Sequence, residues 1–341
     1  MNSFVASGFQ MESAVTSTIF TTSPVANITN RTNVSCKFTD VSDHLVFTFS
    51  YSLVFLVSLV LNCITMRVYF CTNQRVESSV TVYMKNLAAA DFFLCLCLPL
   101  RIANNANYSL KIHNIYCSFG ATAFYINMYA SILFMDFIAA NRYLKIVRPL
   151  ETHSLQTVRT ARHISAATWL SLSATSSIYL ILFLQTARDQ KLGEFTCESQ
   201  HSPELSVAYK IIHCASIVVF VFVLMSLVFL YWKTLQKIRQ AKLTTQTTSS
   251  SHKFDKSKRN MLVLVVVFCV CFVPYHLVRL PYVFSSDCTT AQALNILKEL
   301  TILIAVLNVC FDPLIYFVFC KAFRAQLRKK KDFQRSSEDQ T

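Results

Sequence analysis

Long hydrophobic stretches separated by short polar connections are the main pattern of this chain. Hydrophobic blocks occupy residues 44–71, 80–104, 115–146, 163–185, 205–235, 259–285 and 292–319. Each block exceeds the length of about 20 residues that an α-helix needs to cross the hydrocarbon of a bilayer. The pattern therefore predicts an all-α membrane protein, a bundle of seven transmembrane helices over residues 44–319.

The segments outside the predicted helices are polar. Residues 1–43 form a tail rich in Ser, Thr and Asn, and residues 244–251 are a polar connection that we expect to be a flexible loop. Residues 320–331 place Phe323 and Leu327 four positions apart among basic residues. This spacing predicts a short amphipathic eighth helix on the anionic inner surface of the membrane, followed by a cytoplasmic tail at residues 332–341.

Basic residues concentrate in alternate connections of the predicted bundle. Residues 145–162, 233–259 and 321–335 are rich in Lys and Arg, whereas the connections on the other side are nearly balanced in charge. By the positive-inside rule, we expect a multi-pass plasma-membrane protein with an extracellular amino terminus and a cytoplasmic carboxyl terminus. The sequons agree with an outer location, and the predicted glycosylation sites are Asn27, Asn30, Asn33 and Asn107.

Composition excludes several classes of protein. The chain is 53% hydrophobic and 15% charged, whereas soluble domains carry about a quarter charged residues. The net charge of +14 is spread over alternate connections, which argues against a nucleic-acid partner. We find neither a nucleophile beside a base nor metal-spaced Cys and His, so we expect no enzyme. A transporter is a rival class, but only 3 Gly argue against broken helices.

Single polar residues inside the blocks carry a family resemblance. The marks, in order along the chain, are Asn62, Asp91, Trp169, Pro274 and the run Asp312-Pro313-Leu314-Ile315-Tyr316. With them, residues 44–331 resemble the rhodopsin-like G-protein-coupled receptors. The resemblance implies a receptor that activates a heterotrimeric G protein, with arrestin and receptor kinases as further partners beside membrane lipids.

The resemblance also implies where the signalling switch lies. It assigns the switch and the G-protein contact to Asn141, Arg142, Tyr143, Tyr231, Pro274, Asp312, Pro313 and Tyr316. The family carries an acid before the Arg of the triplet, and this chain has Asn141 there. A neutral amide cannot pair with the charge of Arg142, so we expect some ligand-independent signalling.

Buried polar residues and outer cysteines give two further expectations. Relatives hold a sodium ion at the positions of Asp91, Ser131, Asn308 and Asp312, and carboxylates suit such a hard cation. A water-filled polar network is the alternative. Four of the 13 Cys lie in outer segments, where the space is oxidising. The resemblance implies the disulfide pairs Cys117–Cys197 and Cys36–Cys288.

Cationic residues near the outer ends of the sixth and seventh blocks indicate a ligand. His276, Arg279 and Tyr282 are three apart on one predicted helical face, and Lys298 begins the seventh block. A guanidinium and an ammonium beside Tyr rings suit a phosphate-bearing ligand. Alternatively, Arg279 and Lys298 extend to the lipid headgroups, or Lys298 pairs with Glu299.

Three longer motifs narrow the resemblance. FYINMYASI, FVPYHLVRLPY and LKELT resemble the purinergic branch that includes the platelet ADP receptor and a UDP-sugar receptor. This implies an adenine nucleotide or UDP-sugar as ligand and the inhibitory G protein as partner. The candidate ligand-binding residues are Tyr125, Met128, Tyr209, His213, His276, Arg279, Tyr282 and Lys298. Tyr209 and His213 depart from the ADP receptor, so a lysophospholipid receptor or an orphan receptor with high basal activity remains the alternative.

Overall fold

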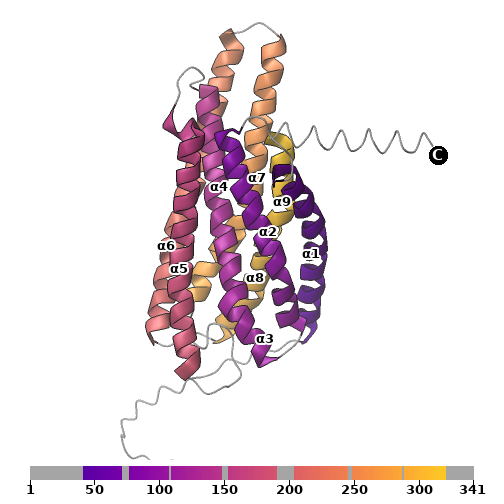
Figure 1. Cartoon of the computed structure of the whole chain (residues 1–341), viewed down its shortest axis with the longest axis vertical. Coiled ribbons are helices and arrows are strands. Elements are labelled where there is room, and N and C mark those ends of the chain that lie inside the picture. Colours follow the sequence, from indigo (N-terminus) through magenta and orange to yellow (C-terminus); the bar gives the residue numbers. More distant parts are fainter. Residues whose placement is uncertain are drawn as a thin grey trace, which may run out of the picture. The chain divides into compact units, whose positions relative to one another are not determined.

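Long helices that lie side by side form the protein (Figure 1). The computed structural model describes residues 41–70, 77–106, 109–147, 153–189, 203–244, 248–285 and 288–319. In chain order the helices are α1 (Val41–Phe70), α2 (Ser79–Ala106), α3 (Leu110–Ile115), the π-helical η1 (Tyr116–Gly120), α4 (Ala121–Val147), the 3₁₀-helical η2 (Ser154–Gln156), α5 (Val158–Asp189), α6 (Pro203–Thr244), α7 (Thr248–Phe284), α8 (Cys288–Val306) and α9 (Asn308–Phe319).

Seven segments of the described residues are long and apolar enough to span a membrane. They are His44–Phe70, Ser79–Ala106, Lys111–Val147, Val158–Thr186, Pro203–Gln240, Lys258–Phe284 and Ala293–Phe317. The third span joins α3, η1 and α4, and the seventh joins α8 and α9. The prediction of seven helices is confirmed, with boundaries that differ by a few residues.

The predictions at the ends of the chain lie mostly outside the described residues. These are the tail at residues 1–43, of which α1 takes the last three, the eighth helix at 320–331 and the tail at 332–341. The prediction of a flexible loop at residues 244–251 was wrong for most of that segment. α6 continues to Thr244 and α7 already begins at Thr248, because Ser and Thr only weakly disfavour helix whereas Pro and Gly, absent here, would end it.

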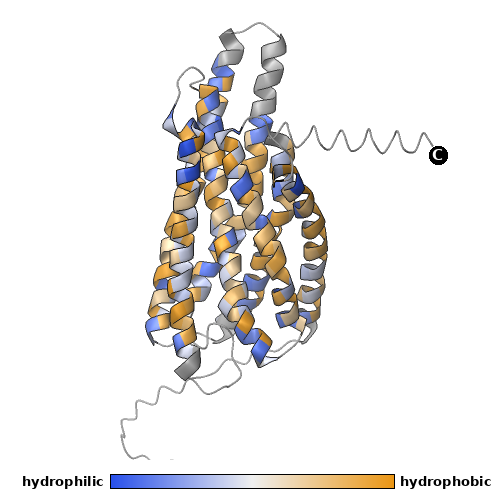
Figure 2. Cartoon of the chain, in the orientation of Figure 1, coloured by the Kyte–Doolittle hydropathy of each residue, from blue (hydrophilic) through white to orange (hydrophobic). Residues whose placement is uncertain are grey.

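Hydrophobic residues cover the outward faces of the helices. Figure 2 shows hydrophobic positions along most of their length. Phe49 of α1 is 73% exposed, and Leu170 of α5 and Leu277 of α7 are 72% and 70% exposed. In water such a surface would aggregate, but in lipid it is solvated. This surface therefore lies against the membrane, and polar residues are buried inside the bundle.

The helix α4 occupies the centre of the bundle. It packs against α2, α5, α6 and α7. Its buried residues include Ile132, Phe134, Met135 and Ile138, all without exposed surface. α4 therefore connects its neighbouring helices along its whole length through one continuous helix.

A hydrogen bond between helices compensates for the proline of α9. Pro313 has no N–H group, so the carbonyl group of Val309, four residues earlier, receives no helical hydrogen bond. Asn62 of α1 donates its side-chain Nδ2 to the oxygen of Val309 at 3.0 Å, and also to the oxygen of Ser58 at 2.9 Å. The amide of Asn62 thereby connects α1 to α9.

Replacing Asn62 by Ala removes the donor and leaves the carbonyl of Val309 unsatisfied in a buried position. We expect Asn62→Ala to lower the free energy of unfolding by about 1–3 kcal/mol. Thermal unfolding of the purified protein in lipid nanodiscs measures the change. The control is Cys63→Ala, because Cys63 is the next residue and is exposed. An equal melting temperature for Asn62→Ala and the native protein would contradict this role.

Candidate ligand-binding site and signalling end

The end of the bundle that carries Arg279 and Lys298 is called the outer end here, after the predicted orientation. Arg279 lies on α7 and is 3% exposed. The guanidinium carbon is 5.8, 5.5 and 5.4 Å from the ring centres of Tyr125, Tyr209 and Tyr282. Arg279 also donates a hydrogen bond to the hydroxyl group of Tyr209. Three tyrosine rings from α4, α6 and α7 thus hold one buried cation by cation–π contacts.

Lys298 of α8 also contacts Tyr282. Its ammonium nitrogen donates to the Tyr282 hydroxyl at 3.3 Å and lies 4.5 Å from the centre of that ring. The same nitrogen is 3.5 Å from Oε1 of Glu299. Lys298 is 8% exposed. Both predicted cations therefore lie inside the bundle and are linked by Tyr282, and Lys298 also has the neighbouring acid as a partner.

Arg101 is a third buried cation of the outer end, and the sequence analysis missed it. It lies on α2, is 6% exposed, and donates from Nη2 to Oε2 of Glu299 at 2.6 Å. It also donates to the Tyr116 hydroxyl and lies 4.6 Å from the centre of the Tyr51 ring. An ionisable residue inside a hydrophobic block is a functional signal by itself, and this criterion could have found Arg101.

Three cationic side chains gather at the outer end. Arg101, Arg279 and Lys298 are buried. The partly exposed carboxylate of Glu299 contacts Arg101 and Lys298, and the three tyrosine rings described above contact Arg279. Cationic residues inside a transmembrane bundle are typical of a functional site. This arrangement therefore favours an anionic ligand.

The remaining predicted ligand residues lie at two depths. His213 of α6 is close to the cluster, with its ring centre 4.2 Å from that of Tyr209 and 5.6 Å from that of Tyr125. His276 lies deeper, because it precedes Arg279 by almost one helical turn. Its Nε2 is 3.1 Å from the hydroxyl of Tyr129, and its ring stacks on Phe220 with centres 3.8 Å apart.

Met128 is also deep in the bundle. It is 1% exposed and belongs to the main hydrophobic core. Met128 and His276 therefore lie below the tyrosine cluster, whereas His213 is in contact with it. Their assignment to the ligand site stays a prediction.

The middle of the bundle contains two carboxyl groups side by side. Asp91 of α2 and Asp312 of α9 lie within hydrogen-bonding reach of each other and are completely buried. Tyr316 donates its hydroxyl to Oδ2 of Asp91 at 2.7 Å, and Asn308 donates to Oγ of Ser131 at 3.2 Å. Neither oxygen of Asp312 accepts a hydrogen bond from a donor among the described residues. All four predicted sodium ligands are thus buried, and Asn308 and Asp312 lie one helical turn apart on α9.

The triplet of α4 lies at the inner end of the bundle, opposite Arg279. Asn141 is 1% exposed, and its Nδ2 donates to Oγ of Ser79 at 2.8 Å and to the carbonyl oxygen of Leu155 at 3.1 Å. Arg142 and Tyr143 are partly buried beside it. Among the other predicted switch residues, Tyr231 packs against the core, and Pro274 and Pro313 lie inside α7 and α9.

The predicted disulfides and glycosylation sites lie largely outside the described residues. Cys117 is buried and disulfide-bonded, but Cys197 and Cys36 are not described, and of Cys288 only its place at the start of α8 is. Both pairings therefore stay predictions. The same holds for glycosylation of Asn27, Asn30, Asn33 and Asn107.

Comparison with known proteins decides the family. Residues 61–316 match the model of the 7 transmembrane receptor (rhodopsin family). This chain belongs to the rhodopsin family of seven-transmembrane receptors. The receptor is 35% identical to purinoceptor 14 of Bos taurus over 295 residues, which are 83% of this chain and 85% of that protein.

Two other relatives show how diverse this part of the family is. The receptor is 30% identical to Lysophosphatidic acid receptor 6 of Gallus gallus, over 89% of this chain and 99% of that protein. It is 27% identical to Probable G-protein coupled receptor 34 of Pan troglodytes, over 88% of this chain and 80% of that protein. Family membership makes the chain a G-protein-coupled receptor of the membrane and not an enzyme.

The ion pair between Arg101 and Glu299 makes the two residues energetically dependent on each other. Arg101→Met leaves a carboxylate with a weaker partner, and Glu299→Gln leaves a buried guanidinium without a carboxylate. We expect the double variant to lose less free energy of unfolding than the two single variants lose together, by about 1–2 kcal/mol. Thermal unfolding in nanodiscs measures this coupling.

The matched control for this double-mutant cycle replaces Lys111, an exposed cation at the same end of the receptor. Lys111→Gln and Glu299→Gln should be additive. If the losses caused by Arg101→Met and Glu299→Gln were additive as well, the ion pair would contribute nothing to the stability of the receptor.

Proposed function

We propose that the receptor binds an extracellular ligand that carries a phosphate group, most simply an adenine nucleotide or a UDP-sugar, and signals through the inhibitory G protein. The observation that carries this proposal is the burial of Arg279 and Lys298 in contact with the same residue, Tyr282. Because a phosphate group accepts several charge-assisted hydrogen bonds, it matches both cations.

The surroundings of the two cations suggest how such a ligand binds. A phosphate group competes with the hydroxyl of Tyr209 for Arg279, and with Glu299 for Lys298. The rings of Tyr125 and Tyr209 then offer flat surfaces for a planar base. Arg101 provides a further donor, already oriented by Glu299 and Tyr116, for the other end of a long ligand.

The names of the relatives support two ligand classes. The relative from Bos taurus is named as a purinoceptor, and the 35% identity to it supports the nucleotide class. Lysophosphatidic acid receptor 6 is named for a lysophospholipid and aligns along 99% of its length. A lysophospholipid headgroup also carries phosphate and would use the same cations, so it is the second candidate.

The proposal is tested with ADP, a UDP-sugar and lysophosphatidylserine, each measured by the fall of cAMP in transfected cells. Because Arg279 and Lys298 bind the phosphate group in this proposal, we expect Arg279→Ala and Lys298→Ala each to raise the half-maximal ligand concentration by about tenfold or more. The control is Lys210→Ala, since Lys210 follows Tyr209 on α6 but is exposed.

Each result of this panel decides between the candidates. A response to ADP or the UDP-sugar supports the nucleotide class, and a response to lysophosphatidylserine alone supports the second candidate. A ligand whose half-maximal concentration is unchanged in both variants would show that the cations do not form the ligand site.

We propose further that Asp91, Ser131, Asn308 and Asp312 hold a sodium ion. Two adjacent carboxylates repel each other unless a proton or a cation lies between them. The oxygens of Asp312 that accept no hydrogen bond among the described residues are the kind of ligand that a hard cation prefers. In this proposal the ion supplies a positive charge that holds α2, α4 and α9 together.

Sodium binding predicts an ion-specific effect on stability. The native receptor should melt a few degrees higher in sodium chloride than in choline chloride at equal ionic strength, because a ligand of the folded state stabilises it. Asp312→Asn removes one carboxylate and should abolish most of this difference. An equal melting temperature of the native receptor in both salts would favour the water-filled network instead.

A further inference from the structure

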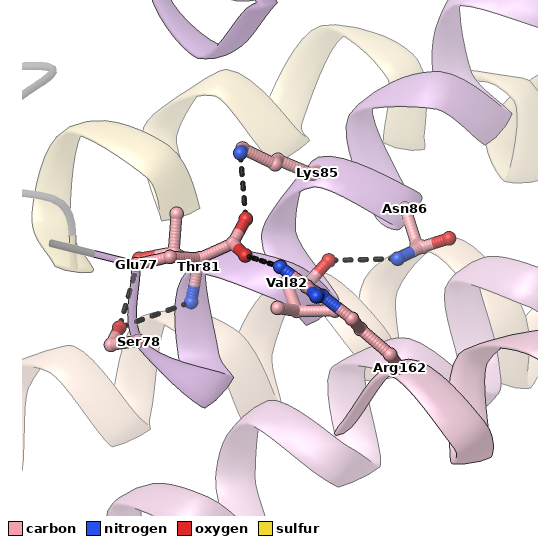
Figure 3. Close-up of polar contacts among 7 residues, drawn as sticks. All are labelled: Glu77, Ser78, Thr81, Val82, Lys85, Asn86 and Arg162. Carbon is pink, nitrogen blue, oxygen red and sulfur yellow. Dashed lines mark hydrogen bonds and ion pairs between the residues drawn. The ribbon is translucent and has the colours of Figure 1, made fainter. Parts of the chain in front are cut away.

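One carboxylate at the inner end of the receptor connects two helices. Glu77 lies two residues before α2 and binds two basic side chains (Figure 3). Its Oε1 accepts a hydrogen bond from Nζ of Lys85 on α2 at 2.7 Å, and its Oε2 accepts one from Nη2 of Arg162 on α5 at 2.5 Å. Lys85 orients Glu77 against its own helix, and Arg162 extends the contact to the next one.

The charge of Glu77 is maintained at cytoplasmic pH. The hydrogen bonds that Lys85 and Arg162 donate lower the pKa of the Glu77 carboxyl group below its usual value. A lowered pKa means that the contribution of this group to stability is present at neutral pH and is lost only as the pH falls through the lowered value. The Arg162 side chain is 67% exposed, so solvent weakens the pair and its effect is local.

A second contact meets the same region. Asn141 of α4 donates to Ser79, the first residue of α2, and to the carbonyl oxygen of Leu155, in the middle of η2. Glu77 and Ser79 are two positions apart. The start of α2 is therefore the common anchor of two contacts, one to Asn141 of α4, which also donates to η2, and one to Arg162 of α5.

The second inner segment, His153–Thr157, depends on these contacts for its position. Its only helix, η2, has three residues, and so short a 3₁₀ helix is not stable by itself. The segment continues directly into α5, where Thr157 caps the helix by accepting a hydrogen bond from the Thr160 nitrogen at 3.2 Å. Arg162 is five residues further on. Glu77 therefore contacts the beginning of the helix that follows the segment, and Asn141 contacts the middle of the segment.

This segment is also a surface on which a partner can dock. Ser154, Leu155 and Thr157 are exposed, with Leu155 at 40%, at the end of the receptor that is predicted to face the cytoplasm. A partner that binds an ordered surface loses less conformational entropy than one that must order it.

We propose that Glu77 is a positioning residue for G-protein coupling, which acts through Arg162 to keep the second inner segment in the position that the G protein binds. This inference rests on membership of the receptor family and does not depend on the ligand. A contact that kept the receptor inactive would have the opposite effect, since its loss would increase basal activity. Loss of Glu77 should instead weaken coupling.

The first experiment measures the position of the segment directly. Amide hydrogen exchange of residues 153–157, followed by mass spectrometry on the full-length receptor in nanodiscs, should become about threefold to fivefold faster in Glu77→Gln and Arg162→Gln, as expected for the loss of one partly exposed ion pair. Lys85→Gln should change it less, because Lys85 and Glu77 belong to the same helix region. Unchanged exchange in both Glu77→Gln and Arg162→Gln would overturn the proposal.

The second experiment measures coupling without any ligand. Uptake of a non-hydrolysable GTP analogue by the purified heterotrimeric G protein gives the concentration of G protein at half-maximal rate. We expect Glu77→Gln to raise this concentration about threefold to fivefold, and Glu77→Asp, which keeps the charge, to restore part of the loss. A faster basal rate in Glu77→Gln would identify a contact that keeps the receptor inactive and overturn the proposal.

Thermal unfolding separates this role from general loss of structure. Arg162→Gln removes a mostly exposed side chain, so it should fold and melt near the native temperature while reproducing the effects of Glu77→Gln. If the variants altered exchange throughout the receptor equally, Glu77 would be a general stabilising residue and not a positioning residue.

Discussion

The cost of placing a charge in hydrocarbon determines where the polar residues of this receptor lie. Every backbone group in the membrane must be bonded internally, which makes the spans helical. An ionisable side chain either turns inward and finds a partner or, near a helix end, extends to the membrane surface. Asn62 bonds the carbonyl group that Pro313 leaves open, and Arg101 finds Glu299 across the bundle. The lipid-facing surface, in contrast, carries large hydrophobic residues that are exposed in the isolated chain.

The same cost explains how much the sequence could predict. Hydrophobic length located all seven spans, because each must cross the same thickness of hydrocarbon. The polar connection at residues 244–251 was mistaken for a loop because, outside the membrane, hydrophobic length carries no information about helix ends. The positions of Arg279 and Lys298 on their helices were predictable, but their shared contact with Tyr282 depends on how α7 and α8 pack, which helical spacing alone does not give.

Two other features of the site show the limits of single-helix arguments. His276 shares a helical face with Arg279, but one turn is enough to move it from the tyrosine cluster to the aromatic ring of Phe220. Arg101 was not predicted as a functional residue, because it lies near the end of a block in which hydrophobic residues dominate the pattern. In both cases the depth of the residue and its partner on another helix decide its role, and these become visible only in the folded bundle.

Hydrogen-bond direction decides what Asn141 can do at the inner end. A carboxylate at position 141 could only accept hydrogen bonds, whereas the Nδ2 group of Asn141 donates to the carbonyl oxygen of Leu155, which has no proton to give. Asn141 therefore makes a contact to the second inner segment that an acid cannot make. As a neutral amide, it carries no charge that could pair with Arg142. Among the described residues of this end, Glu77 is an acid that pairs with Arg162 of α5. The contacts of Asn141 and the ion pair of Glu77 are thus parts of one arrangement around the start of α2, which connects α4, η2 and α5.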